Sequence, residues 1–434
     1  MKKRILFVDD DPNVLQGLQR MRRPLRSEWN VAFASGGPEA LQKLASEPFD
    51  VVVSDMRMPG MDGAQLLSEV RRLYPQTVRI VLSGHSDQEM ILRSVGPAHQ
   101  YLAKPCDAET LKSTVARACA LHDLLANESL KKLVSQTNSL PSQPGVYAEM
   151  LRILQSPNTS IHEVSRLIAE DVGMTAKILQ LVNSAFFGLR RRVSDPAEAA
   201  VLLGIETIKA LALSVRVFSL FPQPAIRGLA LETVWKHSLA TGTGAKHLAA
   251  TEKLDRTSVD HAFLGGLLHD AGKLLLATNV SDRYAQAVAL ANREKIPLWQ
   301  AEQRTLGATH AEVGAALLGI WGLPDPILEI IAFHHEPRKC PTTGFSTLTA
   351  VHVADALHDL TPAPNGPPPQ PAGQFTALTA VHVADALEWE TGAESLAGAK
   401  PALDLEYLAA IGMANRIEAW RCALASLIPG RNAE

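Results

Sequence analysis

The stretch Val51-Val-Val-Ser-Asp-Met-Arg-Met-Pro-Gly60 decides the fold of the amino-terminal part of the chain. A short apolar run rich in β-branched residues ends in a carboxylate, and a Pro-Gly pair separates it from the helical pattern that follows. Other short apolar runs end at Asp9, Ser83 and Lys104. Apolar runs that alternate with helical patterns predict parallel strands buried on both faces, so we expect a doubly wound α/β domain.

The polar residues that end these runs should lie together, because parallel strands end at one edge of a sheet. Asp9 and Asp10 offer the oxygen ligands that Mg²⁺ prefers. Beside such an ion, the carboxylate of Asp55 can attack phosphorus, while a hydroxyl and an ammonium group steady the phosphoryl oxygens. The residues expected to respond to the phosphoryl group are Ser83, Tyr101 and Lys104.

Residues 1–122 resemble the receiver domain of bacterial two-component response regulators. The resemblance implies a five-stranded parallel sheet with Asp55 as the phosphoacceptor and the backbone carbonyl of Arg57 as a further Mg²⁺ ligand. It also implies a cis peptide bond before Pro105 and a sensor histidine kinase as partner. A receiver-like fold with an inactive pocket is the alternative, but every polar group that the pocket requires is present. The segments that carry the resemblance are Ile5-Leu-Phe-Val-Asp-Asp-Asp-Pro12, Ser54-Asp-Met-Arg-Met-Pro-Gly-Met-Asp-Gly63, Ile80-Val-Leu-Ser-Gly84 and Tyr101-Leu-Ala-Lys-Pro105.

Composition sets the size and class of the whole chain. Its 434 residues suit two or three domains with hydrophobic cores of their own. The net charge of −3 and the lack of a helix-turn-helix or winged pattern argue against a DNA-binding protein. No apolar run approaches the ~20 residues that a membrane span needs, and the basic start Met1-Lys-Lys-Arg4 lacks the long apolar segment of a signal peptide. The four scattered cysteines fit a reducing cytoplasm.

A helical segment connects the first domain to the second. Asp107 can cap a helix whose apolar positions repeat at helical spacing from Leu111 to about Leu133. We assign residues 123–145 to a linker helix, which ends where Ser139-Leu-Pro-Ser-Gln-Pro-Gly145 breaks the pattern. This helix is either a plain extension of the last receiver helix, or a helix that relays the signal or forms a homodimer.

Residues 146–340 predict an all-α domain. Two of its segments, Asp171-Val-Gly-Met-Thr-Ala-Lys-Ile-Leu-Gln-Leu-Val-Asn-Ser-Ala-Phe-Phe-Gly188 and Ala199-Ala-Val-Leu-Leu-Gly204, resemble the HDOD family. HDOD domains are relatives of the HD metal-dependent phosphohydrolases in which the metal site is often eroded. The resemblance therefore implies the helical HD fold without deciding activity. Local signals for helix ends are the capping box of Ser160 and Glu163, the start at Asp195-Pro196 and the stop at Gly204.

An ordered series of histidines and aspartates in this part of the chain matches the ligand order of the HD superfamily. Imidazoles with carboxylates suit two ions such as Fe, Mn, Zn or Ni, which activate water for attack at phosphorus. Asp270 is the natural bridge between them, and Lys273, one turn further on, can bind a substrate phosphate. Any one histidine is more often structural, so the argument rests on their joint occurrence. The predicted ligands are His237, His269, Asp270, His310, His334, His335 and either Asp355 or Asp385.

Residues 341–434 predict a helical extension that contains a duplication. The segment Phe345-Ser-Thr-Leu-Thr-Ala-Val-His-Val-Ala-Asp-Ala-Leu357 recurs almost unchanged at residues 375–387, after a proline-rich spacer at residues 358–374. A single metal site has room for one terminal aspartate. We favour Asp355 over Asp385, because Asp355 follows the paired histidines without the spacer. Closing helices are expected between Asp404 and Leu427, with a core of Leu405, Leu408, Ile411, Ile417, Trp420 and Leu427.

These patterns predict a cytoplasmic two-component response regulator that is phosphorylated on Asp55 and controls an HDOD output domain. In one version the output domain is a scaffold that binds a downstream protein. In the alternative it is an active metal-dependent phosphohydrolase. The related HD-GYP phosphodiesterases, which hydrolyse cyclic di-GMP, carry a Gly-Tyr-Pro stretch after their paired histidines, whereas Glu336-Pro-Arg-Lys-Cys-Pro follows here. A cyclic dinucleotide is therefore a candidate substrate through kinship alone.

Overall fold

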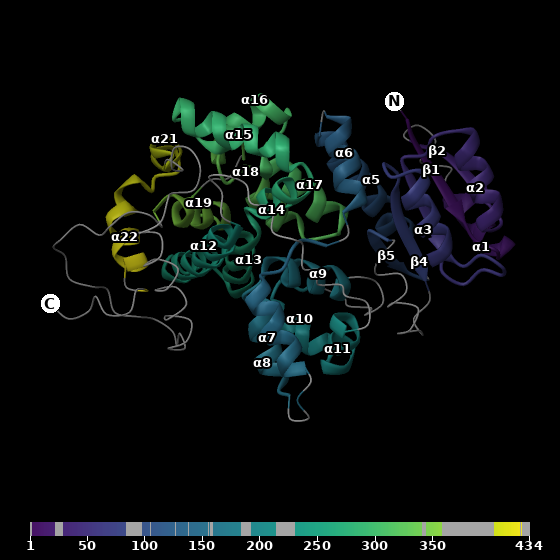
Figure 1. Ribbon diagram of the computed structural model, residues 1–434, viewed down its shortest axis with the longest axis horizontal. Coiled ribbons are helices and arrows are strands. Elements are labelled where there is room, and N and C mark those ends of the chain that lie inside the picture. Colours follow the sequence, from purple (N-terminus) through teal and green to yellow (C-terminus); the bar gives the residue numbers. More distant parts are fainter. Residues whose placement is uncertain are drawn as a thin grey trace.

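The computed structural model has an α/β domain at one end and helices that extend away from it (Figure 1). The structure describes residues 2–21, 29–83, 98–104, 106–125, 127–137, 139–154, 156, 159–183, 192–213, 231–340, 344–357, 403–425 and 427. Within these ranges, no helix is both long and apolar enough to span a lipid bilayer.

Five parallel strands form one sheet in the order β2-β1-β3-β4-β5. Ile5 on β1 pairs with Val31 on one side and with Val51 on the other. The strand order reverses between β1 and β3, which is where open α/β sheets place their ligands. The predicted doubly wound domain is confirmed. Its elements are β1 (Lys3–Val8), α1 (Pro12–Met21), β2 (Trp29–Ala34), α2 (Gly37–Ser46), β3 (Val51–Asp55), α3 (Gly63–Leu73), β4 (Val78–Ser83), β5 (Gln100–Ala103) and α5 (Ala108–Leu124).

Alternate residues of the strands belong to two different cores, because successive side chains of a strand point to opposite faces. Leu6 and Val52 pack in a core with residues of α2 and α3. Ile5 and Val51 pack on the other face with residues of α1 and α5, and this second core continues without a break into the helical part of the chain. The α/β domain is therefore joined to the helices through shared hydrophobic packing.

The linker is two helices, which corrects the prediction of one helix up to about Leu133. Helix α5 ends at Leu124, and α6 (Glu128–Gln136) starts afresh. The reason is local: the side chain of Asn127 accepts a hydrogen bond from the backbone N–H of Ser129 and caps α6, while its amide donates to the carbonyl of Leu306 (2.9 Å). The break thus ties the linker to the following domain.

The rest of the described chain is helical, as predicted. The capping box of Ser160 with Glu163, the cap at Asp195 and the stop at Gly204, whose φ is 77°, all form. These helices are α7 (Pro144–Leu154), α8 (Ile161–Ala169), α9 (Val172–Val182), α10 (Pro196–Leu203), α11 (Ile205–Leu213), α12 (Leu231–Thr251), α13 (Arg256–Leu268), α14 (Ala271–Asn279), α15 (Ser281–Glu294), α16 (Leu298–Leu306), α17 (His310–Ile320), α18 (Asp325–Phe333) and α19 (Thr347–Leu357).

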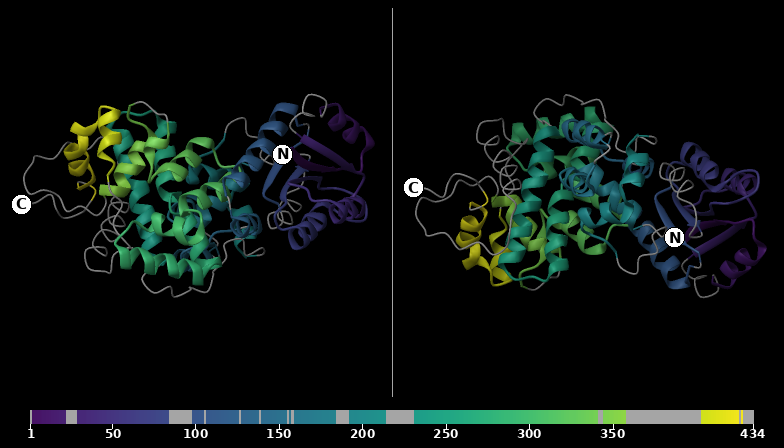
Figure 2. Two further views of the ribbon diagram at one scale, coloured as in Figure 1. Left: turned by 90° about the horizontal axis from the view of Figure 1, so that it is seen from above. Right: turned by 90° about the horizontal axis from the view of Figure 1, so that it is seen from below.

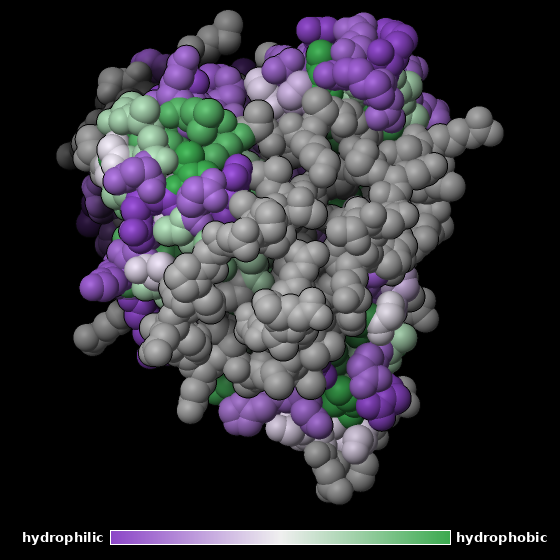
Figure 3. All heavy atoms as spheres, turned by 90° about the vertical axis from the view of Figure 1, so that its left-hand side faces the viewer, coloured by the Kyte–Doolittle hydropathy of each residue, from purple (hydrophilic) through white to green (hydrophobic). Residues whose placement is uncertain are grey.

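Two short helices close the end of the molecule that lies opposite the sheet (Figure 2). Helices α21 (Leu405–Ala410) and α22 (Ile417–Ala425) pack on α12 and α19 in a third core, which contains Leu408 and Trp420. The surface at this end carries hydrophobic side chains in patches between hydrophilic ones (Figure 3). The prediction of Leu405 as a core residue is wrong, because it starts α21 on the solvent side and is 59% exposed. The proline-rich spacer and the second copy of the duplication lie outside the described residues.

Candidate functional site

The first candidate site lies where β1, β3 and β5 end. The ammonium nitrogen of Lys104 is 2.5 Å from Asp55 Oδ1 and 2.6 Å from Asp9 Oδ2. The backbone N–H of Arg57 donates to Asp55 Oδ2 (2.8 Å). Asp9 and Asp55 are 2% and 8% exposed, whereas Asp10 is open to solvent. Two converging carboxylates beside a third that faces water form the oxygen donor set that Mg²⁺ takes.

Burial and charge oppose each other in this pocket. Burial raises the pKa of Asp55, and the hydrogen bond and positive charge of Lys104 partly offset that effect. Burial would lower the pKa of Lys104, but its contacts with Asp55 and Asp9 outweigh burial and raise it. Lys104 is therefore held as a cation between the two carboxylates.

The remaining predicted residues of this pocket have different positions. Ser83 is the last residue of β4, at the same edge of the sheet, and its side chain is outside the described part of the structure. Tyr101 is buried in the core beside α2 and α3. Pro105 also lies outside the described residues, so the cis peptide bond stays a prediction.

The second candidate site is a cluster of imidazoles and carboxylates between helices that are far apart in the sequence. His237 comes from α12 and Asp355 from α19, while His269 and Asp270 join α13 to α14. His310 is the first residue of α17, and the two remaining histidines directly follow α18. His335 is partly buried, and the other residues of this cluster are buried. The structure thus brings together His237, His269, Asp270, His310, His334, His335 and Asp355; Asp385 lies outside the described residues.

The cluster divides into two halves with Asp270 between them. In one half, His237 Nε2 is 3.0 Å from Asp355 Oδ1, and His269 Nε2 is 3.6 Å from the same oxygen. Asp270 Oδ2 faces this half, 3.4 Å from His269 Nε2.

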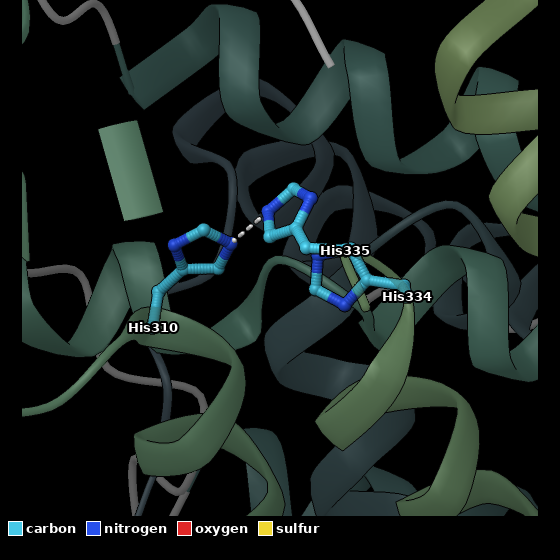
Figure 4. Close-up of side chains that lie close together, drawn as sticks. All are labelled: His310, His334 and His335. Atoms are coloured by element: carbon cyan, nitrogen blue, oxygen red, sulfur yellow. Dashed lines mark hydrogen bonds between the residues drawn. The ribbon is translucent and has the colours of Figure 1, made fainter. Parts of the chain in front are cut away.

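The other half contains three histidines. The Nε2 atoms of His335 and His310 lie 3.0 Å apart, and the ring of His334 is beside them (Figure 4). Asp270 Oδ1 faces this half, 3.2 Å from His310 Nε2 and 4.0 Å from His334 Nε2. The two oxygens of Asp270 therefore point to different sets of ligand atoms, which is the arrangement a bridging carboxylate needs.

Hydrogen bonds fix the tautomers of three of the imidazoles. The Nδ1–H of His269 donates to the carbonyl of Gly266 (2.6 Å), and that of His334 to the carbonyl of Ile331 (2.9 Å). The Nδ1–H of His310 donates to Glu302 Oε2 (2.7 Å). In its neutral form, each of these rings turns the lone pair of Nε2 into the cluster, as metal-binding histidines do.

Unsatisfied atoms show that these residues fit a metal ion. His269 Nε2, His334 Nε2, Asp270 Oδ1 and Asp355 Oδ2 are buried without a hydrogen-bond partner in the described part of the chain. Buried lone pairs without partners are rare and costly. In each half, three residues offer one atom each, and these atoms lie within 4.8 Å of one another. The residues are His237, His269 and Asp355 in one half and His310, His334 and His335 in the other. A divalent cation in each half would satisfy the buried lone pairs.

Pairs of glycines allow the helices to bring these ligands together. Gly242 on α12 touches Gly266 on α13, and a Cβ on Gly266 would lie 2.6 Å from the Cα of Gly242. A Cβ on Gly272 of α14 would overlap the carbonyl of His310 at the start of α17. These close backbone contacts set the distances from His237 to His269 and from Asp270 to His310.

Comparisons with known proteins agree with this architecture. Residues 5–116 match the family described as response regulator receiver domain, and residues 140–337 match the HDOD domain family. The chain joins a receiver domain to an HDOD domain. The HDOD match starts and ends a few residues before the predicted limits of 146 and 340.

Similar proteins cover only parts of this chain. An uncharacterised protein of Treponema pallidum is 27% identical over 223 residues, which are 51% of this chain and 43% of that protein. The hydrogenase transcriptional regulatory protein HoxA of Cupriavidus necator is 40% identical over 116 residues, 26% of this chain and 23% of that protein. The chain thus spans less than half the length of these curated relatives. Among solved structures, the MmoQ response regulator of Methylococcus capsulatus is 26% identical and covers 52% of this chain and 89% of its own, with a TM-score of 0.42. The signal receiver domain of an HD domain-containing protein from Pseudomonas fluorescens is 35% identical. It covers 27% of this chain and 94% of its own, with a TM-score of 0.26.

The two domains and the response regulators among the relatives indicate a response-regulator role. A receiver domain implies a phosphodonor such as a histidine kinase.

Charges in the HDOD cluster shift the pKa values of its histidines in opposite directions. The carboxylates around His269 and His310 outweigh burial and raise the pKa of both rings. Burial would raise the pKa of Asp270, but the positive charges of His269 and Lys273 outweigh it and hold the pKa well below its usual value. Burial lowers the pKa of His334 and His335 well below the ordinary value, and the charges of neighbouring histidines lower it further. At neutral pH the carboxylate is therefore ionised and these two rings are neutral, as ligands must be.

Lys273 lies within the cluster, although its predicted phosphate contact stays a prediction. Its ammonium is 2.6 Å from Asp270 Oδ2, and the residue is 6% exposed. The carboxylate raises the pKa of Lys273 despite burial, which alone would lower it. Lys273 therefore orients the carboxylate of Asp270.

Two residues of the HDOD cluster were missed from the sequence. Glu302 on α16 is fully buried and holds His310. His352 on α19 donates through Nδ1 to the carbonyl of His334 (2.8 Å), and its Nε2 accepts from the backbone N–H of Asp404 (3.0 Å). Glu302 lies eight residues before His310, on another helix, so no local spacing identifies it. His352 belongs to the duplicated segment and could have been found as a histidine one helical turn before Asp355.

Proposed function

We propose that this chain is a response regulator in which phosphorylation of Asp55 controls a metal-holding HDOD domain. The observation that carries the proposal is the convergence of Asp55, Asp9 and Lys104 at the end of the sheet. Bound Mg²⁺ would neutralise the carboxylates and the incoming phosphoryl group. Asp9, Asp10, Asp55 and the Arg57 carbonyl are its proposed ligands, and Ser83, Tyr101 and Lys104 are the residues that respond.

Direct contacts between the domains support control of one by the other. β5 ends next to Lys104 in the phosphorylation pocket and begins at Gln100. The side-chain amide of Gln100 donates to the carbonyl of Ile320 at the end of α17 (2.8 Å). The preceding residue, His99, accepts a hydrogen bond at its carbonyl from Gln180 of α9 (2.9 Å). A displacement of β5 on phosphorylation would therefore reach α17, which begins with His310.

Phosphorylation can be tested with a small-molecule phosphodonor such as acetyl phosphate and Mg²⁺. We expect the wild-type chain to shift on a phosphate-affinity gel and Asp55→Asn to lose the shift. Asp62→Asn is the matched control, because asparagine keeps the N-cap of α3. A shift that persists in Asp55→Asn would refute the assignment of the phosphoacceptor.

A second candidate function is metal-dependent hydrolysis of a phosphoester by the HDOD domain. It is favoured by a ligand set without gaps: both halves of the cluster and the carboxylate between them are in place. Two divalent ions would polarise the phosphoester and activate water there. The chain's own contribution is to hold neutral imidazoles and to orient Asp270 through Lys273. His335 is the proposed side of approach for the substrate, since it is the least buried ligand.

An experiment can distinguish this second function from an output domain that acts only as a scaffold. The purified protein, supplemented with Mn²⁺ or Fe²⁺, is analysed for bound metal and then incubated with cyclic di-GMP as the first substrate. We expect bound metal in the wild type and its loss in His269→Ala and Asp270→Ala. His162→Ala is the matched control, because His162 is exposed on α8, outside the cluster. Absence of bound metal would refute the enzyme and favour the scaffold, whose partner is a downstream protein. We propose in both cases that the protein is cytoplasmic and has no DNA-binding element.

A further inference from the structure

Glu302 is a buried carboxylate that the proposed function leaves without a role. It lies on α16 with no exposed surface. Its Oε2 accepts two hydrogen bonds from His310, one from the Nδ1–H (2.7 Å) and one from the backbone N–H (2.7 Å). Its Oε1 accepts a hydrogen bond from the hydroxyl of Tyr284 on α15 (3.0 Å).

The environment of Glu302 suits an anion near an added positive charge. It lies at the amino terminus of α17, where the helix dipole stabilises negative charge. Its hydrogen-bond donors are an imidazole, an amide and a phenol, and no lysine or arginine forms an ion pair with it among the described residues. A carboxylate taken out of water is costly unless it is paired with a charge. A cation on the far side of the His310 ring would supply that charge.

The two halves of the cluster differ in how their carboxylates are placed. The half with His237 and His269 has Asp355 in direct contact in addition to one oxygen of Asp270. The half with His310, His334 and His335 has the other oxygen of Asp270, and Asp355 reaches it only through Oδ2, which is 4.0 Å from His335 Nδ1. Glu302 is the carboxylate that touches this half, one imidazole ring away.

We infer that Glu302 is a positioning residue that makes His310, His334 and His335 a divalent-cation site. The inference rests on the proposed metal-holding function of the HDOD domain. Glu302 fixes the Nδ1–H tautomer and the ring plane of His310, so that Nε2 presents its lone pair to the ion. Asp270, Asp355 and Lys273 together leave the cluster with one net negative charge. Glu302 adds a second negative charge, which offsets the positive charge of bound ions.

A purely structural role would be to clamp α16 to the start of α17. Such a clamp needs hydrogen bonds but no negative charge, and Glu302→Gln separates the two roles. Glutamine has the same shape and can still accept from His310 through its amide oxygen. It loses the charge that makes the imidazole a better ligand.

The test measures the affinity of the full-length protein for Mn²⁺ and Zn²⁺ by competition with a chromophoric chelator. We expect Glu302→Gln to bind roughly 10–100-fold more weakly than wild type, as other carboxylates behind ligand histidines do. Nitrogen NMR of the histidines in the metal-free protein gives a second measurement, in which His310 should lose its fixed Nδ1–H form in Glu302→Ala. Tyr284→Phe is the matched control: it removes one donor to Glu302 but keeps the charge, so its affinity should stay within about threefold of wild type.

The outcomes distinguish this inference from the proposed function. Wild-type protein that binds neither ion refutes the metal site, and the role of Glu302 falls with it. Wild-type protein that binds while Glu302→Gln binds equally well refutes the role of Glu302 alone. If Glu302→Gln does not fold, Glu302→Asp replaces it, and its shorter carboxylate should restore folding with weakened binding. Equal binding by Glu302→Asp and wild type would again overturn the inference.

Discussion

The side-chain amide of Gln100 donates to the carbonyl of Ile320 across 2.8 Å, and so connects the receiver sheet with the helix that starts at His310. Gln100 begins β5, and Lys104 directly follows the same strand. One strand and one helix therefore link the two candidate sites. Coupling through packed, rigid elements needs a shift that both sites can bias.

Replacing Gln100 by alanine should weaken this coupling. Loss of one buried hydrogen bond costs about 1 kcal/mol, so the protein should still fold. Hydrogen exchange of residues 310–320, measured with and without beryllium fluoride as a phosphoryl mimic, should respond in wild type and respond less in Gln100→Ala. Gln16→Ala, at an exposed position of α1, should behave as wild type. An undiminished response in Gln100→Ala would exclude this route.

Replacing Gly272 by alanine should separate the two halves of the metal cluster. The new Cβ would overlap the carbonyl of His310, so α14 and α17 must move apart. Overpacking of this kind costs about 1–3 kcal/mol, and the distance from Asp270 to His310 should grow. Urea denaturation should show a lower free energy of unfolding for Gly272→Ala, and Mn²⁺ titration should show a lower affinity. Gly145→Ala, an exposed helical position with nothing near its Cβ, should leave stability unchanged or raise it by about 0.5–1 kcal/mol; equal behaviour of the two variants would contradict the packing argument.

Stability should rise with pH above neutrality because of Lys177. This residue on α9 is buried, and its ammonium donates to Gln180 Oε1 (2.8 Å) and lies 5.5 Å from the ring centre of Trp321. Burial lowers its pKa from 10.5 to about 7. Between these values the unfolded chain binds more protons than the folded chain, so the free energy of unfolding increases with pH.

The measurement compares urea midpoints at pH 7 and pH 9 for wild type and Lys177→Met. Lys177 contributes at most about 1.4 kcal/mol per pH unit, and the variant should lack this part of the slope. Lys132→Met, at an exposed position on α6, should keep the wild-type slope. If stability changes equally with pH in wild type and Lys177→Met, the prediction is wrong. The contacts of the buried ammonium would then stabilise its charged form.

Local signals explain which parts could be predicted from the sequence. The strands of the receiver, the cap at Asp195 and the stop at Gly204 depend on residues within a few positions, and the structure has all three. The break at Asn127 was missed, because the apolar spacing continues through it and its amide binds Leu306, far along the chain. Glu302 was missed for the same reason: its role depends on α16 packing beside the start of α17.

The duplicated segment supplies its own control for the metal ligands. Asp355 and Asp385 have the same neighbours in sequence, from Leu348 to Leu357 and from Leu378 to Leu387. Asp355 lies 3.0 Å from His237 Nε2 and is 4% exposed, so Asp355→Asn removes a direct carboxylate from one half of the cluster. We expect at least about tenfold weaker Mn²⁺ binding, whereas Asp385→Asn should bind as wild type. If Asp385→Asn weakens binding and Asp355→Asn does not, the second copy supplies the ligand and the choice of Asp355 is wrong.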